Sequence, residues 1–269
     1  IIVLFITFYF LLLPSHLSYA GGKVYWTPNG VLVNNFNAGV MSPIDDMKGG
    51  VILLTAFSPN PTVHFIYAFR VDRNGNIPWG LSGKKVDSSS VYQFSPRGVS
   101  DGKGGAIIIW PRGANPWSWL CYQRIDSLGN RVWGDTARRV VLSDSQVNPV
   151  AVADGNGGVI VAWQQWISGQ CDIYAQRIDS SGVRRWGNYG VPVCTADSAQ
   201  EYPAITSDNF GNSVITWHDF RNGNSDLYAQ RLNINGLPLW QINGIAVCDT
   251  EGTQNNAGLG AKAIVMATD

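Results

Sequence analysis

Charged side chains are scarce in this sequence, and their signs balance. Asp, Glu, Lys and Arg make up 14% of the 269 residues, with 19 basic residues against 19 acidic ones, whereas a typical soluble domain carries about 25%. Without a basic excess, the chain has no electrostatic attraction for nucleic acid or for an anionic membrane surface. We therefore expect neither of these partners.

Familiar catalytic and metal-binding motifs are missing as well. The chain has three histidines. His16 lies near the N-terminus, and His64 and His218 are too far apart in the repeat pattern below to favour a shared zinc site. No Gly-x-Ser-x-Gly, His-Glu-x-x-His or P-loop sequence occurs. The sequence therefore predicts no catalytic residues, no metal site and no required cofactor.

No apolar run is long enough to cross a bilayer. The run at residues 1–13 falls short of the roughly 20 residues that a spanning helix needs. Ser18 and Ala20 follow it at the two positions that signal peptidase reads. We interpret residues 1–20 as a signal peptide, with a membrane anchor as the alternative. A secreted or cell-surface protein without a stable membrane span is expected.

Cysteine is sparse, with four in the chain. Cys194 and Cys248 are separated by one full step of the repeat described below, so they occupy equivalent places that are too far apart to form a disulfide. Cys171 and Cys194 can face each other across one hairpin, which leaves a disulfide there open. Burial as small apolar residues is the favoured interpretation for the others, including Cys121.

Glycine and tryptophan are abundant, with 30 and 11 copies, and they recur at a fixed step. Four segments related to Tyr-Ala-Gln-Arg-Ile-Asp each precede a turn glycine and then a tryptophan. Their arginines, Arg70, Arg124, Arg177 and Arg231, follow one another at a nearly constant step of about 54 residues. A second pattern precedes each segment, an aspartate and a glycine-containing turn followed by an apolar run rich in β-branched residues; it reads Asp-Gly-x-Gly-Gly in the second and third repeats and varies in the first and fourth. It indicates a tight hairpin that enters a strand.

Each repeat reads as four strands, here called a, b, c and d in chain order. In the third repeat we expect strands near residues 149–153, 159–163, 173–178 and 184–194, the last with a bulge at residues 187–190. Strand b is apolar on both faces, as a strand between neighbouring sheets should be. Four antiparallel strands per unit of about 54 residues predict an all-β protein, a β-propeller of four-stranded blades. The near-complete blades are residues 36–87, 88–141, 142–194 and 195–248, with partial blade pieces at 21–35 and 249–269.

The segment Ile-Thr-Trp-His-Asp-Phe-Arg-Asn-Gly-Asn-Ser-Asp-Leu-Tyr that ends at Tyr228 resembles repeats of large secreted bacterial proteins with tandem propeller blades. Its layout is also similar to TolB-type blades. The element Asp179-x-x-Gly182-x-x-x-Trp186 looks like a stretched sialidase Asp-box, with longer spacing, so sialidase chemistry does not follow. The resemblance implies a repeat architecture on a bacterial surface and leaves the activity unassigned, because such folds host many functions.

Residues that recur once per blade are expected to be packing elements. Eight of the tryptophans fall in the two repeat patterns, and each strand-c arginine can bond to a neighbouring aspartate or backbone. Asp101, Asp154 and Asp208 open glycine-rich turns, where aspartate bonds to backbone amides two residues on. Calcium at these aspartates is the alternative, although an oxygen cage needs several convergent ligands.

The positions that break the repeat are the candidates for function. The loops that join strands b and c differ in every repeat, and rigid β scaffolds place function on variable loops. Together with the loops that join strands d and a, they supply our candidate ligand-binding residues, namely Trp117, Trp119, Trp166, Phe220, Asp219, Arg221, His218, Tyr202 and Glu201. We hypothesise that the three tryptophans form a platform for sugar rings or a peptide. The alternative is that these rings only cover the ends of their own blades.

These observations favour an extracellular, non-catalytic binding or scaffold module whose partner is a polysaccharide or a cell-surface protein. The first alternative is a propeller hydrolase or lyase that acts on glycans, with Asp219 and Glu201 as a possible carboxylate pair. The second is a structural surface spacer with no ligand.

Overall fold

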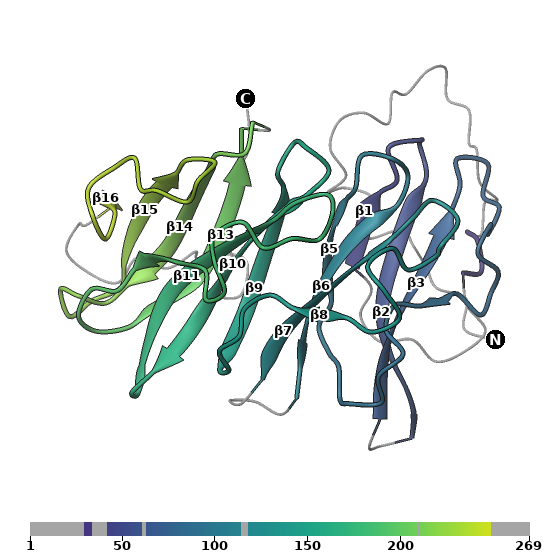
Figure 1. Ribbon diagram of the computed structural model, residues 1–269, viewed down its shortest axis with the longest axis horizontal. Coiled ribbons are helices and arrows are strands. Elements are labelled where there is room, and N and C mark those ends of the chain that lie inside the picture. Colours follow the sequence, from purple (N-terminus) through teal and green to yellow (C-terminus); the bar gives the residue numbers. More distant parts are fainter. Residues whose placement is uncertain (1–29, 34–41, 61–62, 114–117, 209, 249–269) are drawn as a thin grey trace.

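The computed structural model describes residues 30–33, 42–60, 63–113, 118–208 and 210–248. Within these ranges it contains strands and no helix (Figure 1), and so no helix there is long and apolar enough to cross a membrane. The strands, in chain order, are β1 (Ser42–Asp45), β2 (Val51–Asn60), β3 (Val63–Val71), β4 (Lys84–Lys85), β5 (Arg97–Ser100), β6 (Ala106–Arg112), β7 (Trp119–Ile125), β8 (Arg138–Arg139), β9 (Gln146–Ala153), β10 (Val159–Ile167), β11 (Gln170–Ile178), β12 (Val191–Cys194), β13 (Gln200–Ser207), β14 (Ser213–Asp219), β15 (Asp226–Leu232) and β16 (Ile245–Cys248).

The strands form four antiparallel sheets of four strands each, and each sheet takes its strands in sequence order. We number these blades one to four along the chain. The first strands of successive blades are neighbours, β1 beside β5, β5 beside β9, and β9 beside β13. The blades follow one another in an arc across Figure 1. This is the arrangement of a β-propeller, so the predicted fold class is confirmed.

The second strand of each blade is buried on both faces, as its sequence predicts. Ile107 and Ile109 of β6 pack against the third blade, while Trp110 on the opposite face packs against the first. Similarly, Trp163 faces the second blade and Trp217 faces the third. Burying such a side chain stabilises the fold by roughly 1.5–3 kcal/mol, so the core is a series of layers between neighbouring blades.

A carboxylate–guanidinium pair closes the turn between strands a and b. In the third blade, Asp154 accepts hydrogen bonds from the amides of Asn156 and Gly158 with one oxygen, and pairs with Arg177 through the other at 2.9 Å. The same pair recurs as Asp46–Arg70 and Asp101–Arg124, each at 2.8 Å. The predicted packing role of the repeated aspartate and arginine is thereby explained.

Contacts to the next blade come from the strand-c arginines and the tryptophans after the c–d turns. Arg70 and the Trp79 indole both donate to the carbonyl of Ser127 in the second blade. The Trp186 indole donates to the carbonyl of Ile234 in the fourth. Each of these tryptophans therefore fastens its blade to the following turn.

Strand d differs from the prediction for the third repeat. Only Val191–Cys194 form the strand β12, and residue 184 contributes an isolated bridge to β11. Gly187 and Gly190, where we expected a bulge, have φ of 75°, and the chain between them leaves the ladder. The predicted signal peptide, residues 1–20, and the segment 249–269 lie outside the described residues, and the described part of the piece 21–35, residues 30–33, forms no strand.

All four cysteines are free thiols, so the disulfide left open between Cys171 and Cys194 is absent. Both are buried in the sheet of the third blade. Burial raises the pKa of the Cys171 thiol to about 11 and that of the Cys194 thiol to about 12. At neutral pH they are protonated and unreactive.

Candidate functional site

The variable loops lie together on one face of the propeller. Because every blade has the same strand order, its b–c hairpin and the following d–a connection point to the same side, the lower side in Figure 1. We call this side the loop face and the opposite side, with the repeated Asp–Arg turns, the turn face. The candidate residues belong to two groups on the loop face.

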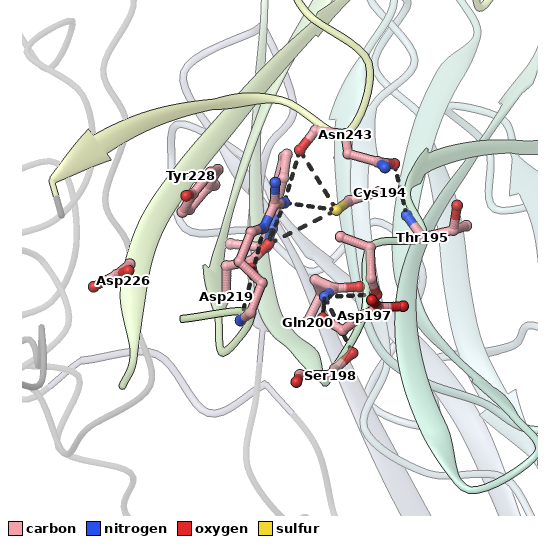
Figure 2. Close-up of polar contacts among 12 residues, drawn as sticks. Cys194, Thr195, Asp197, Ser198, Gln200, Asp219, Asp226, Tyr228 and Asn243 are labelled. Carbon is pink, nitrogen blue, oxygen red and sulfur yellow. Dashed lines mark hydrogen bonds and ion pairs between the residues drawn. The ribbon is translucent and has the colours of Figure 1, made fainter. Parts of the chain in front are cut away.

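Asp219 and Arg221 form the first group, which lies at the boundary between the third and fourth blades, because both contact the sulfur of Cys194 in the third blade; Figure 2 shows Asp219 beside Cys194. Asp219 is fully buried, and its carboxylate accepts from the Trp217 indole at 2.7 Å and from Arg221 at 2.6 and 2.8 Å. Arg221 also donates to the carbonyl of Asn243 at 2.8 Å and to the sulfur of Cys194 at 3.1 Å. The carboxylate is thus fully engaged in holding the boundary together.

This buried pair has the electrostatics of a structural contact. The hydrogen bonds to Asp219 raise the pKa of Arg221 further, against the opposing effect of burial, so the guanidinium stays charged. Its plane also lies over the ring of Tyr228, 4.1 Å from the ring centre. A carboxylate held this way has no free oxygen to donate or accept a proton from a substrate.

Glu201, Tyr202 and His218 form the second group, on the opposite face of the fourth blade. Glu201 of β13 lies directly across from His218 of β14, whereas Gln200 lies across from Asp219. The Tyr202 ring packs edge-on against the His218 ring at 6.0 Å. Since neighbouring residues of a strand point to opposite faces, Glu201 and Asp219 do not point toward a common site.

Trp166 reaches the loop face from the third blade. It lies at the end of β10, across from Cys171 of β11, and 41% of its surface is exposed. The pKa of the Cys171 thiol is raised first by burial and also by the negative charges of Glu201 and Asp172. Both carboxylates therefore lie near this sulfur, Asp172 as the next residue of β11 and Glu201 on β13 of the fourth blade.

Asp172 is a candidate that the sequence analysis missed. Burial raises the pKa of its carboxyl, a property that suits a general acid. Its only sequence signal is an acid two places before the strand-c tyrosine, a feature that the third repeat shares with Asp226 of the fourth and with neither of the first two. Asp226 differs because its carboxylate is buried and accepts from Asn222 and Asn224.

The remaining candidates lie elsewhere. Trp119, at the start of β7, is half-buried against the core between the first two blades, and the Arg139 guanidinium lies 5.3 Å from its ring centre. Phe220 is half-buried, and its amide donates to the carbonyl of Ala199. Trp117 lies outside the described residues. Trp166 therefore lies on the third blade across from Cys171, and Glu201 and Tyr202 lie on the fourth blade beside His218. Trp119 belongs to the boundary between the first two blades.

A second aromatic group lies on the loop face. Tyr92, in the connection from the first to the second blade, has its ring 4.3 Å from the ring of His64 and 5.5 Å from the ring of Phe94. Tyr92 is 39% exposed. An exposed aromatic ring thus lies at two places on the loop face. Tyr92 lies between the first and second blades, and Trp166 lies on the third blade.

No metal centre is found among the residues that the structure describes, since no three His, Cys, Asp or Glu side chains gather there. The turn aspartates that we considered for calcium are on the turn face, where Asp101 and Asp154 use their oxygens on amides and arginines. They form no shared oxygen cage.

The fold defines the class of protein, a β-propeller of four-stranded blades. No known family model matches the chain, and no curated protein matches it either. Among solved structures, the α-L-arabinanase of Penicillium chrysogenum complexed with arabinobiose is similar, with a TM-score of 0.52, 14% identity, and coverage of 84% of this chain and 72% of that one. A protein of unknown function from Dyadobacter fermentans has a TM-score of 0.52 and 12% identity, with coverage of 77% and 69%. At this identity the likeness concerns the fold.

Proposed function

We propose that this chain is a glycan-active propeller, whose loop face binds a polysaccharide and hydrolyses it. The observation that carries the proposal is the exposed indole of Trp166 across from Cys171, near the carboxylates of Glu201 and Asp172. The negative charges of both carboxylates raise the pKa of the Cys171 thiol. An exposed aromatic ring with carboxylates nearby suits stacking on a sugar ring and bonding to its hydroxyls. The propeller fold is shared with the arabinanase named above, which supports this choice by analogy.

Hydrolysis assigns different work to the two carboxylates. A glycosidase needs one carboxylic acid that protonates the leaving oxygen and a second carboxylate that acts as a base or nucleophile. Burial raises the pKa of Asp172, so we test Asp172 as the acid and Glu201 as the second carboxylate, each on its own, because Asp172 points to the face of β11 opposite to that of Cys171 and Trp166. Asp219, which the sequence suggested as partner of Glu201, is committed to Arg221 and the Trp217 indole.

The second candidate function is binding without turnover, as in a secreted or surface-displayed module. It rests on the same exposed Trp166 and needs no carboxylate pair. The two functions share a ligand-binding surface and differ only in whether the bond is cleaved.

The test is to incubate the purified chain with arabinan, xylan and mannan, and to measure both retention on the polymer and release of reducing ends. We expect release from at least one polymer, loss of release in Glu201→Gln and in Asp172→Asn, and weaker retention in Trp166→Ala. Asp144→Asn is the matched control, because its acid is on the loop face but is half-exposed and paired with Arg139. Retention without release would establish the binding function instead, and neither retention nor release would refute both.

A further inference from the structure

His218 has a buried ring nitrogen without a partner. The residue is 5% exposed, and its Nδ1 lies 2.9 Å from the hydroxyl of Ser225. Among the residues that the structure describes, no group bonds to its Nε2. Such an unsatisfied buried group costs about 1–3 kcal/mol, so its place in the fold calls for a physical reason.

The equivalent position one blade earlier shows what such a side chain does. Gln164 precedes His218 by one repeat and has the same place after the buried tryptophan of its strand. Its Nε2 donates to the sulfur of Cys171 at 3.2 Å, as His218 contacts Ser225, which follows Cys171 by one repeat. The Oε1 of Gln164 accepts from the side-chain amide of Asn148 in its own blade and from the backbone amide of Tyr202 in the next blade, the latter at 3.2 Å. One of its partners thus comes from the first strand of the following blade.

The sequence after β16 repeats the start of that strand. Gln146 and Gln200 are buried at the first positions of β9 and β13, and Gln93 is buried in an isolated bridge just before β5. They follow one another at the step of the repeat, and Gln254 follows Gln200 at the same step. Asn256 therefore stands one repeat after Tyr202. Residues 249–269 lie outside the described part of the structure.

We propose that the face of β14 that points away from the third blade, here called the outer face, docks the segment 254–258 of the same chain. In this arrangement the Nε2 of His218 accepts a hydrogen bond from the backbone amide of Asn256. The outer face carries a second polar group in the same situation, since the hydroxyl of Thr216 is buried and has no partner among the described residues. In the third blade the corresponding residue, Ala162, is buried between blades. The face is therefore built as a boundary between blades.

The protonation state of the ring fits an acceptor. Burial lowers the pKa of His218, which keeps the imidazole neutral near pH 7. A neutral ring has one donor and one acceptor. In the tautomer whose Nδ1 donates to Ser225, as Gln164 donates to Cys171, Nε2 is the bare acceptor that an amide requires.

Amide hydrogen exchange of the full chain tests the docking. We expect the Asn256 amide to be protected in the wild type, to stay protected in His218→Gln, which copies Gln164, and to exchange about tenfold or more faster in His218→Leu. His64→Leu is the matched control and should leave this amide unchanged. The amides of β10 serve as an internal reference for global stability.

Three results would overturn the proposal. The first is a wild-type Asn256 amide that exchanges as fast as in an unfolded chain. The second is equal protection in the wild type and His218→Leu while β10 stays protected. The third is protection that falls on dilution, since the occupant would then be a second copy of the chain. If His218→Leu does not fold, the wild-type and His218→Gln measurements alone decide.

Discussion

The contacts on the turn face are nearly the same from blade to blade, whereas those on the loop face differ. On the turn face, one contact repeats almost without change, as the Asp–Arg distances of 2.8, 2.8 and 2.9 Å in the first three blades show. On the loop face, the residue two places after each strand-b tryptophan differs from blade to blade. Arg112 pairs with Asp87 of the first blade, Gln165 donates to the carbonyl of Asp144 at 2.7 Å, and Asp219 binds Arg221.

This difference identifies where the sequence is free to vary. A position that must form the same contact in every blade keeps one residue type. A position where several side chains can form a suitable contact varies from blade to blade. Function is therefore to be sought on the loop face, and the turn face can be treated as scaffold. The fourth blade departs from the rule, because its Asp208–Arg231 pair is 3.6 Å apart and about a third exposed.

The largest effect is expected from the charge of the buried turn pair. Asp154→Asn keeps an acceptor for the amides of Asn156 and Gly158 but leaves the buried Arg177 without its counter-charge. We expect the free energy of unfolding to fall by about 3 kcal/mol. Asp208→Asn, the matched variant at the more exposed pair, should cost less than about 1 kcal/mol. Urea unfolding at constant m-value measures both, and equal losses would show that burial does not set the value of this pair.

The sequence predicts the repeated scaffold better than it predicts the loop face. The regular step of the repeat predicts the blades, and the apolar run predicts the second strand, which extends from Val159 beyond the expected Trp163 to Ile167. Fixed periodicity and burial suffice for these elements. Register with the repeat also separates the packing tryptophans from Trp166.

The candidate site was predicted less well, for a physical reason. The sequence indicates which loops share a face but not which side of a blade each side chain takes. Glu201 and Asp219 therefore looked like neighbours, although they lie across from His218 and Gln200 respectively, on opposite faces. Asp172 becomes a candidate only through its burial, which the repeat pattern does not encode.

The next largest effect is expected where the tryptophan of one blade packs on the turn glycine of the following blade. A Cβ on Gly182 would lie 2.8 Å from the Trp133 ring, and the glycine has φ of 80°. We expect Gly182→Ala to lower the free energy of unfolding by about 2–3 kcal/mol. Gly187→Ala, with φ of 75° and open space around the added atom, should cost only the backbone strain of about 1 kcal/mol. Thermal unfolding of the pair tests this, and an equal cost would mean that Trp133 moves aside freely.

A smaller effect, of opposite sign, is expected at the first turn. Met47 has φ of 56°, at the position where the second and third blades have Gly102 and Gly155 with φ of 72° and 77°. Met47 is also 62% exposed, so its side chain contributes little packing. Met47→Gly should raise the free energy of unfolding by up to about 1 kcal/mol. Gly102→Ala, which adds an atom in open space, should lower it by a similar amount, and a loss of stability in Met47→Gly would contradict the comparison of turns.

The smallest effect on stability is expected at the centre of the candidate site. Trp166 and Trp163 lie on opposite faces of β10, and their exposed fractions are 41% and 0%. Trp166→Ala should change the free energy of unfolding by about 0.5 kcal/mol or less, while Trp163→Ala should lower it by about 3–5 kcal/mol. A scaffold tryptophan is retained because its loss unfolds the protein. A large stability loss in Trp166→Ala would place this ring with the scaffold, as a cover for its own blade, and would remove the main support for a ligand site on the loop face.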